Sequence, residues 1–411
     1  GVGCKEIVAV APLLALLYDR LFLAGSWRAA WRARRGMYVA LAVSWLALAV
    51  FLLSGPRGGA VSLTFADWTP VAYARTQLGV VAHYLRLAVW PHPLVADYHD
   101  WPVARAIPTS GWLVLALLAV TVWGVWRGQR WSFLGAVVVL VLAPSSSFIP
   151  VVTEVAAERR MYLPLASVIA AAVLVTRRWA VWWAVPVAAV LGGLTYQRNE
   201  VYRSPQAFWG DVLTKRPNNG RALTNYGNLL LADGRTAEAR DLYRRALAVS
   251  PELPEVHNNL AYASALLGDA ATAGRHYTEA LRLKPDYAAA HVNFARLLAG
   301  AGRLDLAIAH QAEAVRLVER EVSWRSTLAV YLSEHGDTAG AIRELRECVR
   351  REPAVADWRY NLGLALAAAG DRAGAVAEWQ RAVELDPQHD GARAELAKVQ
   401  GADANSSKRV R

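Results

Sequence analysis

Residues 254–287 read PEVHNNLAYASALLGDAATAGRHYTEALRLKPDY, and a pattern of the same 34-residue length recurs five times without a gap between Gly220 and His389. The fifteenth position of every copy is glycine, at Gly234, Gly268, Gly302, Gly336 and Gly370. The twentieth position of every copy is alanine, at Ala239, Ala273, Ala307, Ala341 and Ala375. Proline occupies the thirty-second position of four copies, and Glu319 that of the other. Small residues at helix crossings and glycine at a turn predict two short antiparallel helices in each copy.

These features resemble the tetratricopeptide repeat, whose paired helices stack into an α-solenoid that binds peptides or proteins. Residues 220–389 are therefore expected to form five repeats. Residues 205–219 resemble the second helix of an incomplete repeat, which links the array to the preceding part of the chain. Residues 390–400 are expected to form a polar capping helix, and residues 401–411 a disordered basic tail.

The part of the chain before the repeats is apolar and basic, with 18 Lys and Arg residues against 8 Asp and Glu residues in residues 1–204. Its apolar stretches are Ile7–Phe22, Met37–Leu53, Gly111–Val125, Trp131–Ala143, Leu163–Thr176 and Trp179–Tyr196. Tryptophan and tyrosine stand at many of their ends, which is typical of membrane interfaces. We expect an all-α chain in which residues 1–200 form a multi-span transmembrane helical domain. Core helices of a soluble domain are the alternative, because several stretches are shorter than the ~20 residues of an average span.

The charge and the cysteines exclude several classes of function. Residues 205–411 carry 27 basic against 26 acidic residues, whereas a nucleic-acid-binding domain would carry the positive excess. Cys4 and Cys348 provide no metal-binding or disulfide framework, so we expect no metal site, no bound cofactor and no nucleic-acid partner. Cys348 occupies a small-residue position of its repeat and is expected to be buried. The chain begins without methionine or a signal peptide, and we expect it to be part of a longer protein.

Basic residues between the apolar stretches predict the orientation of the chain. The linkers 24–36, 127–130 and 177–178 contain arginine but no acidic residue, as cytoplasmic loops do. The alternate linkers, 55–110 and 144–162, are longer and include acidic residues. Six alternating spans then place the repeats outside the cytoplasm, in a multi-pass protein such as one of a bacterial inner membrane.

Three basic side chains in the outward segments are candidates for binding a lipid phosphate. Lys5 precedes the first apolar stretch, and Arg159 and Arg160 precede the fifth. Arginine suits phosphate because its forked donors match the oxygen geometry. The alternative is that these side chains only anchor the chain at the membrane interface. The amphipathic segment Thr69–Trp90 is expected to lie along the same outer surface.

These segments resemble the membrane-anchored tetratricopeptide O-mannosyltransferases and their bacterial relatives. The matching stretches are Lys5-Glu6 with Leu17-Tyr18-Asp19, Arg75-Thr76-Gln77 with Tyr84-Leu85-Arg86-Leu87, Trp90-Pro91 with Asp97-Tyr98, Ser147-Phe148-Ile149-Pro150, and Ala157-Glu158-Arg159-Arg160-Met161-Tyr162-Leu163-Pro164. The resemblance implies a glycosyltransferase of the GT-C type, which moves a sugar from a polyprenyl-phosphate carrier to an acceptor protein outside the cytoplasm. Donor sugar and acceptor remain open.

The same resemblance places the catalytic carboxylates of the family in a first outward loop, upstream of this chain. The chain therefore lacks the expected catalytic carboxylates, and its catalytic residues are unknown. Asp97 or Asp100 could assist, but neither is assigned as the base. The full protein is expected to be an enzyme, and this part alone is expected to be inactive.

The first helices of the repeats carry a second periodicity that indicates a binding groove. Their sixth positions are Asn225, Asn259, Asn293, Thr327 and Asn361. An asparagine side chain offers both a donor and an acceptor, so a ladder of asparagines could hold an extended peptide backbone without selecting its sequence. This resembles the asparagine ladder of the tetratricopeptide O-GlcNAc transferase. Local capping or helix-to-helix hydrogen bonds are the alternative.

Three functions therefore remain open. The first is the C-terminal part of a polyprenyl-phosphate-sugar-dependent protein O-glycosyltransferase, in which the membrane part binds carrier lipid and the repeats present the acceptor. The second is a non-catalytic membrane-anchored scaffold for assembling envelope proteins. The third is a polysaccharide ligase or polymerase, a class that is also multi-span and can carry such repeats. An Asp/Glu pair in an outward loop upstream of residue 1 would favour the first.

Overall fold

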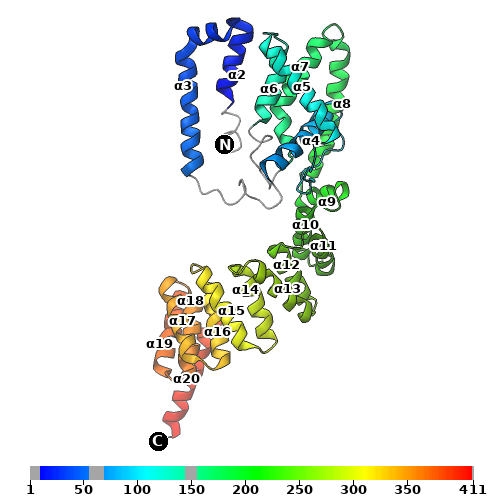
Figure 1. Cartoon of the computed structure of the whole chain (residues 1–411). Helices are drawn as coiled ribbons and strands as arrows, with labels where there is room; N and C mark the ends of the chain where they lie inside the picture. The colour runs from blue at the N-terminus through cyan, green and yellow to red at the C-terminus, as the bar shows by residue number, and fades with distance from the viewer. Residues whose placement is uncertain (1–9, 55–68, 144–154, 410–411) are drawn as a thin grey trace. The chain divides into compact units, whose positions relative to one another are not determined.

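The computed structural model describes residues 10–54, 69–143 and 155–409, and all regular structure within these ranges is helical (Figure 1). The chain divides into two compact units, Gly1–Tyr226 and Gly227–Arg411. The boundary lies beyond the junction at residues 200–205 that the sequence predicts. The reason is that the half repeat and the start of the first full repeat are bonded to the loop that follows α4, as described below.

The first unit consists of helices α2 to α9 and the beginning of α10. Their bounds are α2 Ala11–Tyr18, α3 Trp27–Ser54, α4 Pro70–Val89, α5 Thr109–Trp126, α6 Ser132–Leu142, α7 Tyr162–Val175, α8 Ala180–Val201, α9 Pro205–Lys215 and α10 Gly220–Ala232. A π-helical turn, Asp19–Leu23, follows α2, and a 3-10 turn, Glu158–Met161, precedes α7. The basic stretch at residues 28–35, expected as a linker, lies within α3, and Arg34 interrupts the helix with φ −137° and ψ 27°.

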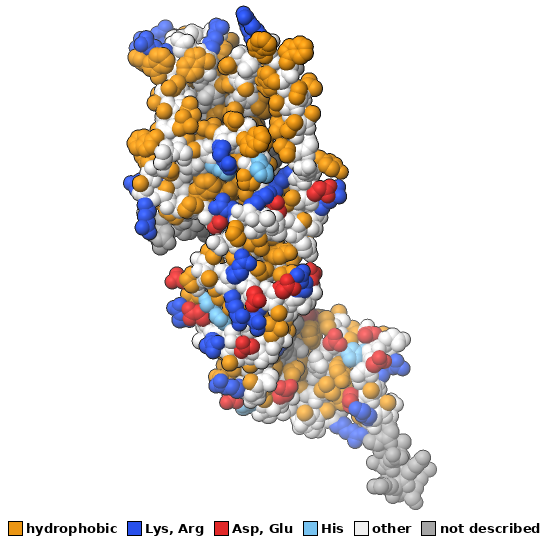
Figure 2. Space-filling view, turned by 90° about the vertical axis from the view of Figure 1, so that its right-hand side faces the viewer, with side chains coloured by type: hydrophobic (Ala, Val, Ile, Leu, Met, Phe, Trp, Pro, Cys, Tyr) orange, Lys and Arg blue, Asp and Glu red, His pale blue; other side chains and the backbone are white. Residues whose placement is uncertain are grey.

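One helix of the described residues, α5, is long and apolar enough to cross a membrane, and the apolar helices at Ser132–Leu142 and Leu163–Val175 are shorter. Large apolar side chains are exposed on this unit, among them Trp112, Trp126 and Trp182. Figure 2 shows many hydrophobic side chains on one face of it. Helices α5 and α6 approach closely, because a Cβ on Gly135 would lie 2.5 Å from Oγ1 of Thr121. Small residues at such contacts are typical of membrane helices. The multi-span domain expected for residues 1–200 stays a prediction.

Helix α4 organises the core of the first unit. Tyr84 is fully buried, its hydroxyl donates to the carbonyl of Ala157 at 2.9 Å, and the N–H of Ala157 donates to it at 2.6 Å. Nε2 of Gln77 donates to the carbonyl of Val155 at 2.9 Å. Buried backbone groups outside regular structure need such partners. Helix α4 thereby fixes residues 155–157, which lead into the Glu158–Met161 turn.

The second unit is the predicted α-solenoid. Its helices after α10 are α11 Thr236–Val249, α12 Pro254–Leu266, α13 Ala270–Leu283, α14 Ala288–Gly300, α15 Leu304–Leu317, α16 Val322–His335, α17 Thr338–Arg351, α18 Ala356–Ala368, α19 Arg372–Leu385 and α20 Asp390–Arg409. All five alanines at the twentieth position have no exposed surface. Tyr243, Tyr277 and Trp379 fill the space between paired helices and are at most 3% exposed. The packing role predicted for the small residues at the twentieth position is confirmed.

The turn inside each repeat depends on its glycine. Gly234, Gly268, Gly302, Gly336 and Gly370 have φ between 73° and 94°. The next N–H bonds to the carbonyl five residues earlier at 2.8–2.9 Å, from Arg235 to Leu230, Asp269 to Ser264, Arg303 to Leu298, Asp337 to Leu332 and Asp371 to Leu366. This is the Schellman end of a helix, which places glycine in the left-handed region. In three repeats an aspartate then caps the second helix, at Asp269, Asp337 and Asp371.

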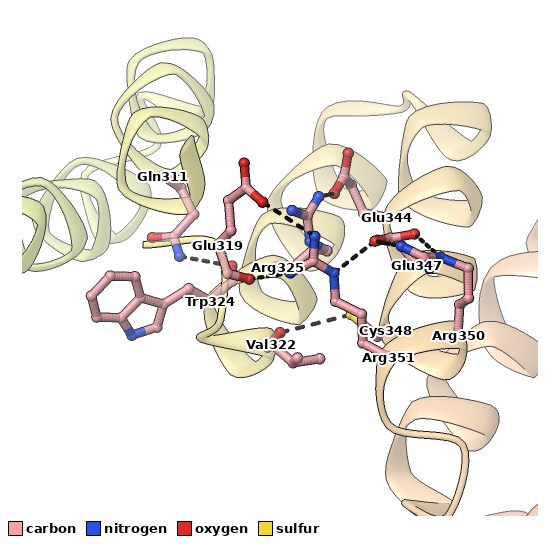
Figure 3. A network of polar contacts seen from close by, with 10 residues as sticks. All are labelled: Gln311, Glu319, Val322, Trp324, Arg325, Glu344, Glu347, Cys348, Arg350 and Arg351. Carbon is pink, nitrogen blue, oxygen red and sulfur yellow. Dashed lines mark hydrogen bonds and ion pairs between the residues drawn. The ribbon is translucent and has the colours of Figure 1, made fainter. Parts of the chain in front are cut away.

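The junction between the third and fourth repeats, which has no proline, is held by side chains of both repeats (Figure 3). Glu319 stands where the other repeats have proline, and a guanidinium N–H of Arg351 donates to its backbone carbonyl. Gln311 replaces the usual buried aromatic residue, and its Nε2 donates to the carbonyl of Trp324 at 2.8 Å. Cys348 is fully buried, as predicted, and burial raises the pKa of its thiol to about 11.

The C-terminal helix differs from the prediction. Helix α20 runs from Asp390 to Arg409, so the disordered tail expected over residues 401–411 is helical through Arg409. That stretch contains no proline, and its one glycine, Gly401, costs only about 1 kcal/mol relative to alanine within a helix. One such residue does not by itself end a helix.

Two glycines provide a matched test of the turn. Gly302 has φ +73°, whereas Gly274 is helical, and a Cβ added to either residue would meet no atom within 4 Å. Gly302→Ala should destabilise the third repeat by about 1–2 kcal/mol, because alanine is disfavoured in the left-handed region. Gly274→Ala should be neutral or stabilise by about 0.5–1 kcal/mol. Hydrogen exchange of the amides in α13 to α15 measures both changes, and equal effects would contradict the role assigned to the turn.

Candidate functional site

The asparagines at the sixth position lie on the first helix of their repeats, and each is partly exposed. Asn259, Asn293 and Asn361 belong to α12, α14 and α18 of the second unit. Asn225 lies on α10, before the boundary between the two units. Partial exposure leaves these amides accessible to a partner. Their role in binding a peptide stays a prediction.

The amides are joined to one another in a continuous hydrogen-bonded chain. Nδ2 of Asn259 donates to Oδ1 of Asn228 at 2.9 Å, which also accepts from the hydroxyl of Tyr243 at 2.7 Å. Nδ2 of Asn258 donates to Oδ1 of Asn259 at 3.1 Å. Oδ1 of Asn258 in turn accepts from Nδ2 of Asn293 at 3.0 Å. This amide chain (Asn228, Asn259, Asn258 and Asn293) crosses three successive first helices.

Arg296 ends the amide chain. Its Nη2 donates to Oδ1 of Asn293 at 2.5 Å, and its guanidinium lies 5.5 Å from the ring centre of Tyr262. Each amide has two N–H donors and two acceptor lone pairs. The internal bonds therefore use only part of this capacity, and the partly exposed amides keep donors and acceptors for a ligand.

The last two repeats present a more apolar version of the same face. The ninth position, one helical turn after the sixth, is Val330 and Leu364, which are 46% and 38% exposed. Residues three apart are neighbours on a helix surface, so Val330 lies beside Thr327 and Leu364 beside Asn361. The side chain of Asn361 makes no hydrogen bond to any residue that the structure describes. The face therefore changes from polar to mixed along the array.

Asp97 and Asp100, the two carboxylates that could assist catalysis, form ion pairs with arginines later in the chain. Oδ2 of Asp97 lies 3.1 Å from Nη1 of Arg221, and Oδ1 accepts from Nδ2 of Asn219 at 3.1 Å. Oδ1 of Asp100 lies 2.7 Å from Nε of Arg216, although the two groups are not aligned as a hydrogen bond. These contacts fasten the loop after α4 to α9 and to the start of α10.

A small aromatic cluster lies beside these ion pairs. Nε2 of His83 is 3.1 Å from the hydroxyl of Tyr98, and the guanidinium of Arg216 is 5.1 Å from the ring centre of Tyr98. His83, Tyr98, Asp100 and Arg216 line a cavity of about 320 Å³. Burial, and then Arg86 and Arg216, lower the pKa of His83 to about 4. His83 is therefore neutral at pH 7 and adds no positive charge for an anionic ligand.

Of the three proposed phosphate-binding residues, the structure describes the side chain of Arg160. Its Nη1 lies 3.4 Å from the carbonyl of Val155, which also accepts from Gln77. Lys5 and the side chain of Arg159 lie outside the described residues. Whether the three side chains share one pocket is therefore untested.

Two polar arrangements in the structure could not be predicted from the sequence. Asp19 is 3% exposed and lies 2.6 Å from Nη1 of Arg34, and the hydroxyl of Tyr38 donates to its other oxygen. The break at Arg34, which brings these groups together, has no sequence signal. Asn258 and Asn228, which complete the amide chain, occupy the fifth and ninth positions of single repeats. Neither residue recurs in register, so periodicity could not identify them.

Comparison with known families identifies the class of the second unit. Residues 227–268 match a family model described as "TPR repeat", and residues 327–404 match one described as "Tetratricopeptide repeat". The array is a tetratricopeptide-repeat domain, as the spacing predicts. Neither match reaches residues 1–226, and neither supports the resemblance to O-mannosyltransferases.

Solved structures with similar arrays share little sequence with this chain. YrrB, "a TPR protein with an unusual peptide-binding site", is 19% identical, with 46% of this chain and 96% of that chain covered and a TM-score of 0.41. PilW, a type IV pilus biogenesis factor, is 21% identical, with 49% and 94% covered and a TM-score of 0.43. MamA from Desulfovibrio magneticus RS-1 is 19% identical, with 42% and 97% covered and a TM-score of 0.39. No curated protein matches the chain.

The amide chain has a structural role that can be measured separately from binding. Asn258 is 6% exposed and bridges Asn259 to Asn293. Asn258→Ala should destabilise α12 to α14 by about 1–3 kcal/mol, because it removes two hydrogen bonds from a buried site. Asn361→Ala, the matched control, should change stability by less than about 0.5 kcal/mol. Local hydrogen exchange measures both, and an unchanged Asn258→Ala protein would mean that the chain contributes nothing to the fold.

Proposed function

We propose that the tetratricopeptide domain binds an extended segment of a partner protein along the face that carries the amide chain. A tetratricopeptide domain is a protein-binding scaffold in general. The observation that supports this face is the row of partly exposed amides, whose internal hydrogen bonds leave donors and acceptors unused. A peptide backbone repeats one donor and one acceptor per residue, which matches an amide surface of this kind.

The partner segment is expected to combine a regular backbone with apolar side chains. The amides of Asn259 and Asn293 would bind its backbone, and the exposed Val330 and Leu364 would contact its apolar groups. Burying exposed apolar surface contributes about 25 cal/mol per Å². The apolar contacts would therefore supply affinity, whereas the amides would set the path of the backbone.

We further propose that the first unit anchors this scaffold in a membrane, with the repeats outside the cytoplasm. Support comes from α5, from the apolar surface of the unit and from the acid-free basic linkers at 127–130 and 177–178. A membrane-anchored scaffold for envelope proteins needs only these features, and it is the function that the geometry supports best.

A second candidate, a polyprenyl-phosphate-sugar-dependent glycosyltransferase, draws support from one contact pattern. Two of the stretches that carry the resemblance are bonded to each other, since Gln77 and Tyr84 of α4 hold Val155 and Ala157. This brings α4 to the segment that leads into Arg159 and Arg160, where a lipid phosphate would bind. On this proposal the partner is the acceptor protein, and the sugar donor is a substrate supplied by the membrane.

Peptide binding is tested with a library of extended peptides and the full chain in detergent. The variant Asn259→Ala/Asn293→Ala/Asn361→Ala should weaken binding by about 10- to 1000-fold, because each lost neutral hydrogen bond costs about 0.5–1.5 kcal/mol. Thr278→Ala, at an exposed position of a second helix, is the matched control and should bind normally. Equal affinities for both variants and the unchanged protein would exclude this face. Added to this set, Asn225→Ala tests the asparagine that precedes the unit boundary.

Carrier-lipid binding is tested with a photoreactive polyprenyl phosphate. Arg159→Ala and Arg160→Ala should each reduce labelling by about 10- to 100-fold, since a charge-assisted hydrogen bond contributes about 1.5–3 kcal/mol. Arg127→Ala, in a linker of the opposite predicted side, is the matched control. Normal labelling of both variants would leave only an anchoring role for Arg159 and Arg160, and the scaffold function would stand.

A further inference from the structure

In four successive repeats, the residue at the fourth position of the repeat contacts the residue at its twenty-third position. The first of these residues lies on the first helix of the repeat and the other on the second helix. The pairs are His257 with His276, His291 with His310, Arg325 with Glu344, and Arg359 with Glu378. The first two pairs join Nδ1 to Nδ1 at 2.9 Å, and the last two are ion pairs at 2.6 Å and 3.0 Å. The same contact between the two helices of a repeat is therefore made by a histidine pair in two repeats and by an ion pair in the next two. Figure 3 shows the Arg325–Glu344 pair.

The hydrogen bonds of the histidine pairs fix where their protons lie. Nε2 of His257 is 2.9 Å from the carbonyl of Pro251, so it carries a hydrogen and donates. In the neutral ring Nδ1 of His257 is then an acceptor, and it receives the hydrogen on Nδ1 of His276. The second pair repeats this arrangement, because Nε2 of His291 lies 3.0 Å from the carbonyl of Pro285.

Each pair can accept one proton without changing its geometry, but not two. The first proton binds Nε2 of the partly exposed His276, which keeps its Nδ1–H donating to His257. A second proton would have to bind Nδ1 of His257, which is 8% exposed. Two N–H donors would then face each other at 2.9 Å. The folded pair therefore binds at most one proton, whereas two histidines of an opened repeat bind two.

The surrounding groups oppose protonation of the first pair on balance. Burial lowers the pKa of His276 most. The neighbouring His257, Arg275 of α13 and Arg244 of α11 lower it further. Glu279 acts in the opposite direction, but its carboxylate is held by two hydrogen bonds from Arg282.

The second pair, His291 with His310, is also partly buried and also lies near a glutamate that is bonded to an arginine. Burial, and then His291, lower the pKa of His310. Glu313 interacts electrostatically with His291, and its carboxylate is held by two hydrogen bonds from Arg316. The ring of Phe294 lies 4.7 Å from that of His310 and adds no charge.

We propose that the two histidine pairs make α12 to α15 an acid-responsive segment of the array, whose opening equilibrium rises below about pH 6 while that of α16 to α19 does not. The sign follows from linkage. Ordinary histidines bind protons below about pH 6.5, so the opened repeat gains more protons than the closed one as the pH falls. The closing equilibrium then weakens about tenfold per pH unit for each excluded proton.

The two ion-paired repeats serve as an internal reference. Histidine is the side chain that ordinarily changes its charge between pH 5 and pH 8, and the two arginine–glutamate pairs contain none. Repeats in a solenoid contact only their neighbours, which allows one part to open before the rest. Residues 258, 259 and 293 of the amide chain lie on α12 and α14, within the responsive segment. If the proposed peptide binding is correct, acid would weaken the binding of the partner.

The test is hydrogen exchange of the full chain in detergent at pH 7.0 and pH 5.0, corrected for intrinsic exchange rates. EDTA is included, because paired imidazole nitrogens can also bind transition metals. Between the two pH values the opening constant of each of the two repeats, α12 with α13 and α14 with α15, should rise about 30-fold for its one excluded proton, relative to the repeats of α16 to α19. The measurement needs no partner, so it can fail independently of the proposed peptide binding.

Two matched variants exchange the pair chemistries that the array already contains. His257→Arg/His276→Glu with His291→Arg/His310→Glu copies the Arg325–Glu344 pair and should abolish the response. Arg325→His/Glu344→His should create it in α16 and α17, and it decides the question if the first variant does not fold. Unchanged protection of α12 to α15 at pH 5.0 would overturn the proposal. Uniform opening of all repeats, equal in the native chain and the first variant, would also overturn it.

Discussion

The array depends on how closely two helices can approach within one repeat. The alanines at the twentieth position have no exposed surface, and large side chains such as Tyr243 and Trp379 fill the remaining space between the helices. A Cβ on Gly363 would lie 2.4 Å from Nε1 of Trp379, so the large residue on one helix requires a small one on the other. Packing of this density tolerates little change in volume. The left-handed glycine then sets the angle at which the chain returns, and everything on the outer faces follows from that geometry.

Such strict packing leaves the remaining positions free to vary, and the variation carries the functional detail. The position that pairs the two helices is occupied by histidine pairs or by ion pairs, and the outward ninth position changes from Asn228 in the first repeat to Val330 and Leu364 in the last two. None of these exchanges alters the buried alanines. The first unit obeys a different constraint, in which Tyr84 and Gln77 satisfy the backbone of a segment without regular structure.

The sequence predicts the repeats well because their signals are local and recur five times. It predicts the boundary between the two units less well, because the contacts of Arg216 and Arg221 with Asp100 and Asp97 join residues more than a hundred positions apart. It identifies three asparagines on the first helices of the second unit but not Asn258, since a residue that occurs in one repeat has no periodicity. It also underestimates the length of α20. The polar composition of residues 401–411 indicates that they are exposed to solvent, but it does not determine whether their backbone is helical.

The junction at Glu319 has a consequence for the order in which the chain becomes structured during synthesis. At the other junctions a proline, such as Pro251 or Pro285, restricts the backbone as soon as it leaves the ribosome. At Glu319 the restraint comes from Arg351, 32 residues later. A nascent chain that has not yet exposed Arg351 therefore lacks this restraint, and the junction of its third and fourth repeats relies on other contacts, such as the bond from Gln311 to the carbonyl of Trp324.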